Sequence, residues 1–369
     1  MPVLALLAGC GDDGARAKPA STAQLLAAPA DAGFARALAP RVLRFPEDHG
    51  AHPDFRTEWW YFTGNLADAS GRRFGFQFTV FRFALAPSTP RRASAFATRD
   101  AWMAHFAVTD VAAQRFHAFE RFARGAAGLA GAHAHPFAVW LEDWRAAVLL
   151  PEPAAGGEDP FPMRLRVHDG EVALDLVLGP GRERVLQGER GLSRKSAEPG
   201  NASYYYSYTR VPATGEVRTP AGRFQVAGQA WMDREWSTSA LAADQSGWDW
   251  FSLQLDDGRD LMFYRLRDRA GAMHAFSAGV MVPRRGRASS LAAGDVVLTP
   301  LRHWRSPAGG SYPVAWRLRT GTLDLEVSAV LDAQEHRAAF RYWEGAVSVR
   351  GRDAARPVTG HGYLEMTAY

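Results

Sequence analysis

The segment EWWYFTGNL, residues 58–66, returns later in the chain as GWDWFSLQL, residues 247–255. Each copy is followed by an acidic turn that contains glycine, and then by a second aromatic segment. The paired segments that follow in the same order are 74–83 with 260–266, 141–145 with 301–305, 165–178 with 316–330, and 226–233 with 358–365. One such match can arise by chance, but five in one order indicate two copies of a single domain.

Within each copy, the apolar residues recur with the period of a β-strand. They occupy alternate positions over residues 172–178 in the first copy and 323–327 in the second, so each row lies on one face. The dipeptides Asp169-Gly170 and Asp257-Gly258 separate such runs, as in hairpins. We count about eight or nine short strands per copy and no long amphipathic helix, which is typical of antiparallel meander barrels. The sequence therefore predicts an all-β protein of two tandem lipocalin-like antiparallel β-barrels, a closed form of which has room for one small ligand.

The length of 369 residues fits two domains, because single cores rarely grow beyond about 250 to 300 residues. The small, polar stretch 237–246 separates the copies. We predict a lipoprotein leader and flexible tether over residues 1–40, an N-terminal barrel over 41–236 and a C-terminal barrel over 237–369. The glycine- and proline-rich pieces 125–131 and 151–160 indicate loops at a barrel mouth.

The single cysteine, Cys10, excludes disulfides within the chain. It ends the sequence LAGC, which matches a bacterial lipobox and predicts lipidation of Cys10. The preceding residues lack the positive start of a signal peptide, which indicates a misassigned start codon or, alternatively, a chance LAGC in an alanine-rich leader. We expect a protein of the cell envelope, anchored to a membrane by its lipid and facing the periplasm, or secreted. Gly11 favours the outer membrane, because aspartate at this position is associated with inner-membrane retention.

The composition excludes several classes of function. The formal net charge of +4 is not concentrated in a basic run, so nucleic-acid binding is not expected. The chain has no Gly-x-Ser-x-Gly elbow, phosphate loop or dinucleotide fingerprint, which are the common hydrolase and nucleotide-enzyme signatures. His133 and His135 place two imidazoles on one strand face, but no third ligand has a recognisable spacing. We expect neither a metal nor another cofactor.

Longer motifs connect the chain to a known family. The motifs are FPEDHG (45–50), HPDFRTEWWYFTG (52–64), YYYSYTR (204–210), the stretch 228–236 and GHGYLEMT (360–367). In these motifs the chain resembles the AttH family of predicted secreted hydrolases, which is lipocalin-like and related to carotenoid 1,2-hydratases. The resemblance covers nearly everything after about residue 41. It implies two lipocalin-like domains, an association with an ABC export system in some genomes, and a related branch that adds water to a carotenoid double bond.

The segment WMDREW, residues 231–236, has the residue types that alkene hydration needs. Such an enzyme requires a protonated carboxylic acid in an apolar site, aromatic faces for the cation, and a positioned water. Asp233 would donate the proton, with Trp231 or Trp236 facing the cation. In the alternative interpretation, which we favour, Asp233 pairs with Arg234 at a strand end and the tryptophans pack as core or stack on arginine.

Glu58 is the second candidate acid. Strand alternation places Trp59 and Tyr61 on one face and Glu58 on the other. If Glu58 points inward, it is a buried acid and a catalytic candidate. If it points outward, it binds an arginine such as Arg56 or Arg82, and ion pairing is the commoner fate of such a residue.

Three further residues are candidates for ligand binding. Arg82 ends an inward apolar row and either binds a carboxylate or lipid head group, or closes the barrel end over an internal carboxylate, which we favour. His105 lies on an apolar strand, where a lone histidine is usually a hydrogen-bonded core residue. Tyr206 shares a face with Tyr204 and Tyr208, which forms a polar-tipped cavity wall if it is inside, as we favour, and an exposed aromatic strip if it is outside. The full set predicted to bind ligand is Trp59, Tyr61, Arg82, His105, Tyr206, Trp231, Trp236 and Trp250.

Three hypotheses of function remain open. The first is an exported lipocalin-like lipoprotein that binds a hydrophobic lipid or isoprenoid in a barrel or in the cleft between barrels, and that could serve an ABC export system through its permease. The second is a hydratase that resembles carotenoid 1,2-hydratase, with Asp233 as the acid. The third is a periplasmic adaptor whose barrels bind only protein.

Overall fold

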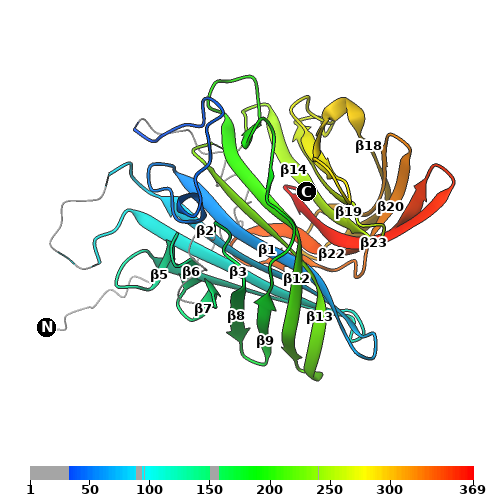
Figure 1. Ribbon diagram of the computed structural model, residues 1–369, viewed down its shortest axis with the longest axis horizontal. Helices are drawn as coiled ribbons and strands as arrows, with labels where there is room; N and C mark the ends of the chain where they lie inside the picture. Colours follow the sequence, from blue (N-terminus) through cyan, green and yellow to red (C-terminus); the bar gives the residue numbers. More distant parts are fainter. Residues whose placement is uncertain (1–32, 89–93, 95, 150–157, 240) are drawn as a thin grey trace, which may run out of the picture.

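The computed structural model describes residues 33–88, 94, 96–149, 158–239 and 241–369. Figure 1 shows two strongly twisted antiparallel sheets packed side by side, with the C-terminal sheet coloured from yellow to red. Cys10 and its predicted lipidation lie outside the described residues. Within those residues, no helix is both long and apolar enough to cross a membrane.

The first sheet contains the strands up to residue 237 and has the order β4-β3-β2-β1-β13-β12-β9-β8-β7-β6-β5. Its strands are β1 (Thr57–Asp68), β2 (Arg73–Ala84), β3 (Asp100–Asp110), β4 (Arg115–Arg124), β5 (Ala130–His133), β6 (Ala138–Leu141), β7 (Trp144–Val148), β8 (Met163–Asp169), β9 (Val172–Leu178), β10 (Val185–Leu186), β11 (Leu192–Arg194), β12 (Ala202–Thr219) and β13 (Gly222–Ser237), after the 3-10 helix η1 (Glu47–His49). The short β10 and β11 pair with β12 beside this path. Because β4 also lies against β6, the sheet curls into a nearly closed barrel.

The second sheet begins with residue 245 and has the order β17-β16-β15-β14-β23-β22-β20-β19-β18. Its strands are β14 (Gln245–Leu255), β15 (Asp260–Asp268), β16 (Ala278–Val282), β17 (Ser289–Ala292), β18 (Val297–Arg305), β19 (Ser311–Thr320), β20 (Leu323–Ala329), β21 (Glu335–Arg337), β22 (Arg341–Asp353) and β23 (Arg356–Thr367), with the 3-10 helix η2 (Ala293–Asp295) before β18. The end strands β17 and β18 do not pair with each other in the described part of the chain. This sheet is therefore an open half-barrel (Figure 1).

The two sheets follow one topology. Reading outward from their centres, β1 beside β13 corresponds to β14 beside β23, and the neighbours on each side correspond in turn. Four of the five repeated segments occupy equivalent strands in the two sheets. The fifth match is not equivalent, because residues 141–145 span the turn from β6 to β7 and residues 301–305 end β18. The predicted all-β class with two tandem antiparallel barrels is thus confirmed. The prediction of a loop over residues 125–131 is partly wrong, because β5 begins at Ala130, where the backbone bonds to β6.

Strand alternation divides the side chains between the barrel interiors and the contact between the barrels. Trp60 and Phe62 of β1 point into the first barrel and are completely buried in its core. Phe251 and Trp316 do the same in the second barrel. The outer face of β1 is also apolar, and Tyr61 belongs to a third cluster that joins the two sheets. Antiparallel sheets usually leave one face in water. Here the outer face is apolar as well, and packing the two barrels against each other removes it from water.

Candidate functional site: a cleft between the two barrels

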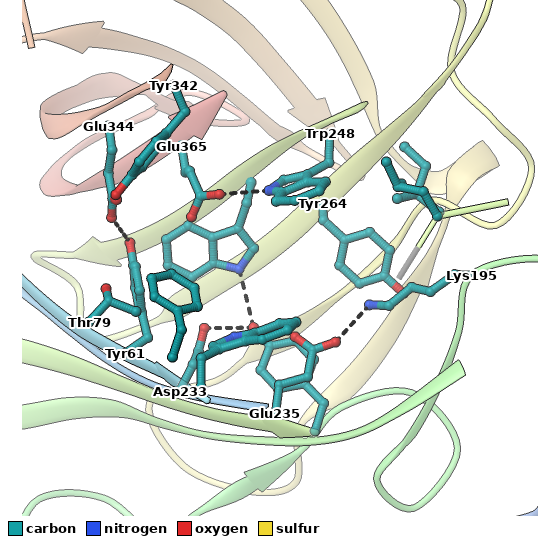
Figure 2. Close-up of a pocket in the computed structure, with 16 residues that line it drawn as sticks. Tyr61, Thr79, Lys195, Asp233, Glu235, Trp248, Tyr264, Tyr342, Glu344 and Glu365 are labelled. Carbon is teal, nitrogen blue, oxygen red and sulfur yellow. Dashed lines mark hydrogen bonds and ion pairs between the residues drawn. The ribbon is translucent and has the colours of Figure 1, made fainter. Parts of the chain in front are cut away.

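The outer faces of the two barrels enclose a cleft. The first barrel contributes Trp59, Tyr61, Thr79, Phe81, Lys195, Tyr205, Asp233 and Glu235. The second barrel and the connection before it contribute Leu241, Trp248, Trp250, Tyr264, Leu266, Tyr342, Glu344 and Glu365. The empty space, with its mouth and the adjoining solvent included, is about 820 Å³. Figure 2 shows Asp233 and Glu235 on one side and Glu344 and Glu365 on the other, with aromatic rings between them.

The duplication makes this cleft approximately symmetric. In the first barrel Tyr61 pairs across the strands with Asp233. In the second barrel Trp250 pairs with Glu365. Because β1 corresponds to β14 and β13 to β23, Asp233 and Glu365 occupy equivalent positions and face each other across the cleft from their own barrels. Each copy of the domain therefore contributes one buried carboxyl group at the same place.

Asp233 is held by neutral hydrogen-bond donors. The Tyr205 hydroxyl donates to its Oδ2 at 2.7 Å, and the Ser207 hydroxyl and Trp231 indole nitrogen donate to its Oδ1 at 2.5 and 2.7 Å. The Trp250 indole in turn donates to the Tyr205 hydroxyl at 3.2 Å. Burial raises the pKa of Asp233 to about 7, against the lowering effect of these hydrogen bonds. At neutral pH this carboxyl group is therefore able both to hold and to release a proton.

Glu344 and Glu365 form a carboxyl pair on the opposite wall. They sit at directly paired positions of β22 and β23. Tyr61 donates its hydroxyl proton to Glu344 at 2.5 Å, and the Trp248 indole donates to Glu365 at 2.8 Å. Burial raises the pKa of both groups, and the negative charge of Glu365 raises that of Glu344 further. Two such neighbours cannot both ionise easily, so the pair retains a proton at neutral pH.

One cation also lines the cleft. The Lys195 ammonium lies 3.2 Å from Glu235 Oε1 and 4.2 Å from the centre of the Tyr264 ring. Burial acts to lower the pKa of Lys195, but the charge of Glu235 outweighs it and the pKa is raised. Lys195 and Glu235 therefore form an ion pair at one end of the cleft, away from the Glu344 and Glu365 pair (Figure 2).

Glu58 lies on the other face of β1, inside the first barrel. Arg82 and Arg234 both bind its carboxylate, and the His52 backbone nitrogen donates to it at 3.0 Å. Burial acts to raise the pKa of Glu58, but the two arginines hold it well below its ordinary value. We expected an inward Glu58 to be a buried candidate acid and an outward one to bind an arginine. The side chain points inward, yet it forms the ion pair that we named as the commoner fate, with Arg82 and Arg234. The alternative pairing of Asp233 with Arg234 is wrong, because adjacent strand residues point to opposite faces.

The predicted ligand-binding residues separate into three places. Trp59, Tyr61 and Trp250 line the cleft, and Trp231 contacts it through its bond to Asp233. The other four lie elsewhere: Arg82, Tyr206 and Trp236 lie in the interior of the first barrel, and His105 lies behind Tyr342 at the contact between the barrels.

The residues inside the first barrel have protein partners. Arg82 bonds to Glu58 and, at 2.8 Å, to Asp100, so it closes the barrel end over an internal carboxylate, as we favoured. Trp236 stacks on the His52 ring with centroids 3.9 Å apart. The Tyr206 hydroxyl lies 2.6 Å from His49 Nδ1, which confirms that this tyrosine row faces inward. Arg82, Trp236 and Tyr206 are thus engaged with protein partners inside the first barrel.

Some residues of the cleft escaped the sequence analysis. The sequence could have predicted Glu365, because the repeat aligns residues 226–233 with 358–365 and thus Asp233 with Glu365. Trp248 was likewise contained in the second copy of the aromatic segment. Lys195 and Glu344 carry no such signal, because they come from segments without a motif. In the described residues, no three histidine, cysteine, aspartate or glutamate side chains form a group that could hold a metal ion.

Comparison with known proteins agrees with this fold. The model of the AttH-like family matches residues 36–369. The structure of an AttH protein from Nitrosomonas europaea is 34% identical with a TM-score of 0.77, and the alignment covers 90% of this chain and 100% of that one. No curated protein matches the chain.

Two more distant structures share the fold. Kievitone hydratase from Nectria haematococca is 14% identical with a TM-score of 0.66, over 91% of this chain and 95% of that one. CghA, solved with Sch210972, is 13% identical with a TM-score of 0.53, over 91% and 96%. At this identity they show the architecture alone. Since the family model spans nearly all of the described residues, the chain belongs to the AttH-like family.

Proposed function

We propose that this protein is an enzyme that adds water to a carbon–carbon double bond of an apolar, isoprenoid-like molecule bound in the cleft. The observation that carries the proposal is Asp233, a buried carboxyl group without a cationic partner among the described residues, at the wall of an aromatic cleft. Its position suits a general acid, because burial among apolar rings raises its pKa to about 7 even though its hydrogen-bond donors favour the ionised form.

The first step is protonation of the alkene. The Asp233 proton passes to one alkene carbon, the π electrons form the new C–H bond, and a cation remains on the other carbon. Trp59, Trp248 and Trp250 line the same space, and the faces of such rings stabilise a cation within about 6 Å. The apolar lining excludes bulk water, which protects the cation until the positioned water attacks.

The second step is attack by water. A lone pair of the water oxygen forms the C–O bond, and one water proton leaves to a base. Glu344 and Glu365 stand on the wall opposite Asp233 (Figure 2). With one proton shared between two carboxyl groups, the pair has an ionised oxygen that accepts the water proton. The acid and the base are therefore on the two barrels, and the substrate lies between them.

The relatives support this assignment as far as their names go. One structure of the same fold is a hydratase by name. The related carotenoid hydratases, which the sequence motifs resemble, act on a double bond of an isoprenoid. In this chain the proposed acid and base derive from its own side chains and do not depend on that likeness.

Binding without turnover is the second candidate, and the aromatic lining favours it. A carrier of apolar lipids has no need of buried carboxyl groups, since each raises the cost of filling the cleft with apolar surface. The presence of Asp233, Glu344 and Glu365 in one cleft therefore favours chemistry. The proposal also includes export of the protein, a lipid anchor at Cys10 and an interaction with the permease of an ABC exporter.

The test is turnover by the full chain. The protein is incubated with a panel of prenylated phenols and linear isoprenoid alkenes in heavy-oxygen water, and products are analysed by mass spectrometry. We expect a product heavier by one labelled water. Asp233→Asn should lower kcat/KM by about 10²–10⁴ fold while ligand binding, followed by quenching of tryptophan fluorescence, is unchanged.

The matched control is Asp324→Asn, the same change at a half-buried residue of β20 in the second barrel that binds Arg317, and it should keep full activity. Tight binding of a panel member with no product by the wild-type protein would establish the carrier instead. Full activity of Asp233→Asn would remove this residue from the mechanism.

A further inference from the structure

A row of hydrogen-bonding side chains runs from the cleft to the protein surface along the contact between the barrels. Glu344 in the cleft hydrogen bonds to Tyr342, two residues earlier on the same face of β22. The Tyr342 hydroxyl lies 2.7 Å from His105 Nδ1, and His105 Nε2 lies 3.0 Å from Glu120 Oε2. The side chains of His105 and Glu120 are 0% and 11% exposed, so the row begins in the cleft and ends at water.

The stacking of rings fixes the middle of this row. The His105 ring stacks on Tyr342 with centroids 5.4 Å apart, and His336 stacks on Tyr342 at 4.6 Å. Phe81 covers another edge of the His105 ring at 5.5 Å. The histidine therefore has a fixed orientation, with one nitrogen toward the cleft and the other toward the surface.

The donors and acceptors in the row agree in direction. A Glu120 carboxylate only accepts, so His105 donates from Nε2 and its Nδ1 is an acceptor. The Tyr342 hydroxyl then donates to Nδ1, and its oxygen accepts from Gln77 Nε2 at 3.3 Å. Once Glu344 has taken up a proton, its carboxyl group is able to donate to the same oxygen. With Glu344 protonated, the three links from Glu344 through Tyr342 and His105 to Glu120 all point from the cleft toward Glu120. In such a row, each group accepts a proton from the group before it and passes its own proton to the next.

The reaction proposed above needs such an exit. Each turnover takes one proton from Asp233 and leaves one water proton on the Glu344 and Glu365 pair. Since hydration consumes no net proton, Asp233 must regain one proton from solvent through the cleft mouth after product release. The pair must lose its added proton before the next cycle. A path that bypasses the mouth lets the pair lose this proton while product still occupies the cleft.

We propose that Tyr342, His105 and Glu120 form a proton relay that drains the Glu344 and Glu365 pair to solvent. Glu344 gives its proton to the Tyr342 oxygen, the Tyr342 hydroxyl proton passes to His105 Nδ1, and the Nε2 proton passes to Glu120. Return of the relay to its starting state releases that proton to water, so one proton leaves and no bond other than O–H and N–H changes. This inference rests on the proposed hydration for its purpose.

The neighbouring ionisable groups leave this path open. His336 stacks on His105 and Tyr342, but its Nε2 has no hydrogen-bond partner among the described residues. Burial lowers the pKa of His336 well below its ordinary value, so it remains neutral. His336 therefore supports the rings without joining the row, which makes it the natural comparison for His105.

The variant His105→Phe keeps a ring in the stack and removes both nitrogens. In the full chain we expect kcat to fall about 10–100 fold, at the lower end of acid–base effects, with KM unchanged and a larger solvent deuterium effect on kcat. Imidazole added to the buffer should restore part of the rate. His336→Phe, in the same stack, should keep the wild-type kcat, and a fall as large as that of His105→Phe would overturn the relay.

A second measurement needs no turnover and separates the two proposals. The cleft is filled with N-phenyl-1-naphthylamine, the pH is changed by rapid mixing, and the carboxylic-acid band of the Glu344 and Glu365 pair is followed by infrared spectroscopy. Glu344→Gln identifies the band. We expect proton loss to be at least about tenfold slower in His105→Phe than in His336→Phe.

The outcomes are distinct. Slow proton loss in His105→Phe supports the relay even if the hydration assay finds no product, which would overturn only the proposed function. Equal rates in the two variants overturn the relay even if hydration is found. If His105→Phe does not fold, His105→Gln and Tyr342→Phe carry the same comparison, and each should slow the exchange.

Discussion

Glu58 and Asp233 are both buried carboxyl groups on neighbouring strands, yet the structure gives them opposite protonation. Glu58 points into the first barrel, where Arg82 and Arg234 hold its pKa well below the ordinary value. Asp233 points to the cleft, where burial raises its pKa to about 7 and only neutral donors bind it. Burial is nearly the same in the two places. The partners therefore decide which carboxylate is a structural ion and which is a proton donor.

The second barrel repeats this division. Asp249 points into its interior and pairs with Arg265 and Arg267. Glu365 points to the cleft and receives the Trp248 indole proton. In both copies the inner carboxylate meets arginines and the outer one meets neutral aromatic donors, because successive residues of a strand face opposite sides. Duplication of one domain has thus placed two unneutralised acids opposite each other.

The largest effect is expected from breaking the inner ion pair. Glu58→Gln leaves Arg82 and Arg234 buried without their carboxylate and should lower the free energy of unfolding by about 3–5 kcal/mol. Urea unfolding followed by tryptophan fluorescence measures it. The control Glu326→Gln removes an exposed partner of Arg350 and should cost less than about 1 kcal/mol. Equal losses of stability in the two variants would show that the buried ion pair of Glu58 contributes no more than a surface pair.

An intermediate effect is expected for Asp233→Asn, and it should depend on pH. Folded Asp233 keeps its proton up to about pH 7, whereas the unfolded chain loses it near the ordinary value of 3.8. The folded state binds more protons in this window, so wild-type stability contributed by Asp233 falls as pH rises from about 4 to 7. Asp233→Asn removes this fall, so relative to wild type it should gain up to about 4 kcal/mol across the window, at about 1.4 kcal/mol for each pKa unit.

Glu58 predicts the opposite slope. Because the pKa of Glu58 is lowered in the folded protein, its ionisation stabilises the fold at pH values above 4.5, the ordinary pKa of the group. This contribution is lost as the pH falls from 4.5 through the lowered pKa. Urea titrations across the pH range for wild type, Asp233→Asn and Asp324→Asn separate the two slopes. A stability difference between wild type and Asp233→Asn that does not change with pH would show that Asp233 is ionised throughout.

The smallest effect is expected from Trp248→Phe. This change keeps an aromatic ring in the cleft but removes the 2.8 Å hydrogen bond to Glu365, at a cost of about 1 kcal/mol. The pKa of Glu365 should rise further, because the bond favours its charged form. Infrared titration of the carboxyl band measures the shift. Trp304→Phe, a change at a half-buried tryptophan of the second barrel, should leave that titration unmoved, and a shift of equal size there would argue against the assigned bond.

Much of the architecture followed from local patterns. The alternation of apolar residues predicted the strands, and five repeated segments predicted two copies with one topology. The faces of Trp59, Tyr61 and Glu58 also followed from the period of two. The predicted boundary between residues 236 and 237 stays a prediction, as do lipidation at Cys10 and the roles of the individual site residues.

The candidate site was only partly predictable. Asp233 and its tryptophans were recognised by residue type, but the pairing of Glu58 with Arg234 depends on the register of β1 against β13. Likewise, Glu344 meets Glu365 because β22 lies beside β23 in one register. His105 approaches Tyr342 across the contact between the barrels, over a separation in the chain that no local pattern reports.

By itself, the sequence determined the class of fold, the duplication and which side chains share a strand face, because these depend on neighbours along the chain. Only the tertiary structure decided which face became a barrel interior and which became the cleft. That choice depends on two outer faces packing against each other, and it sets the partner of every buried carboxyl group. Since the pKa of a buried acid depends on what surrounds it in space, the chemistry of Asp233 and Glu365 arises only when the two barrels meet.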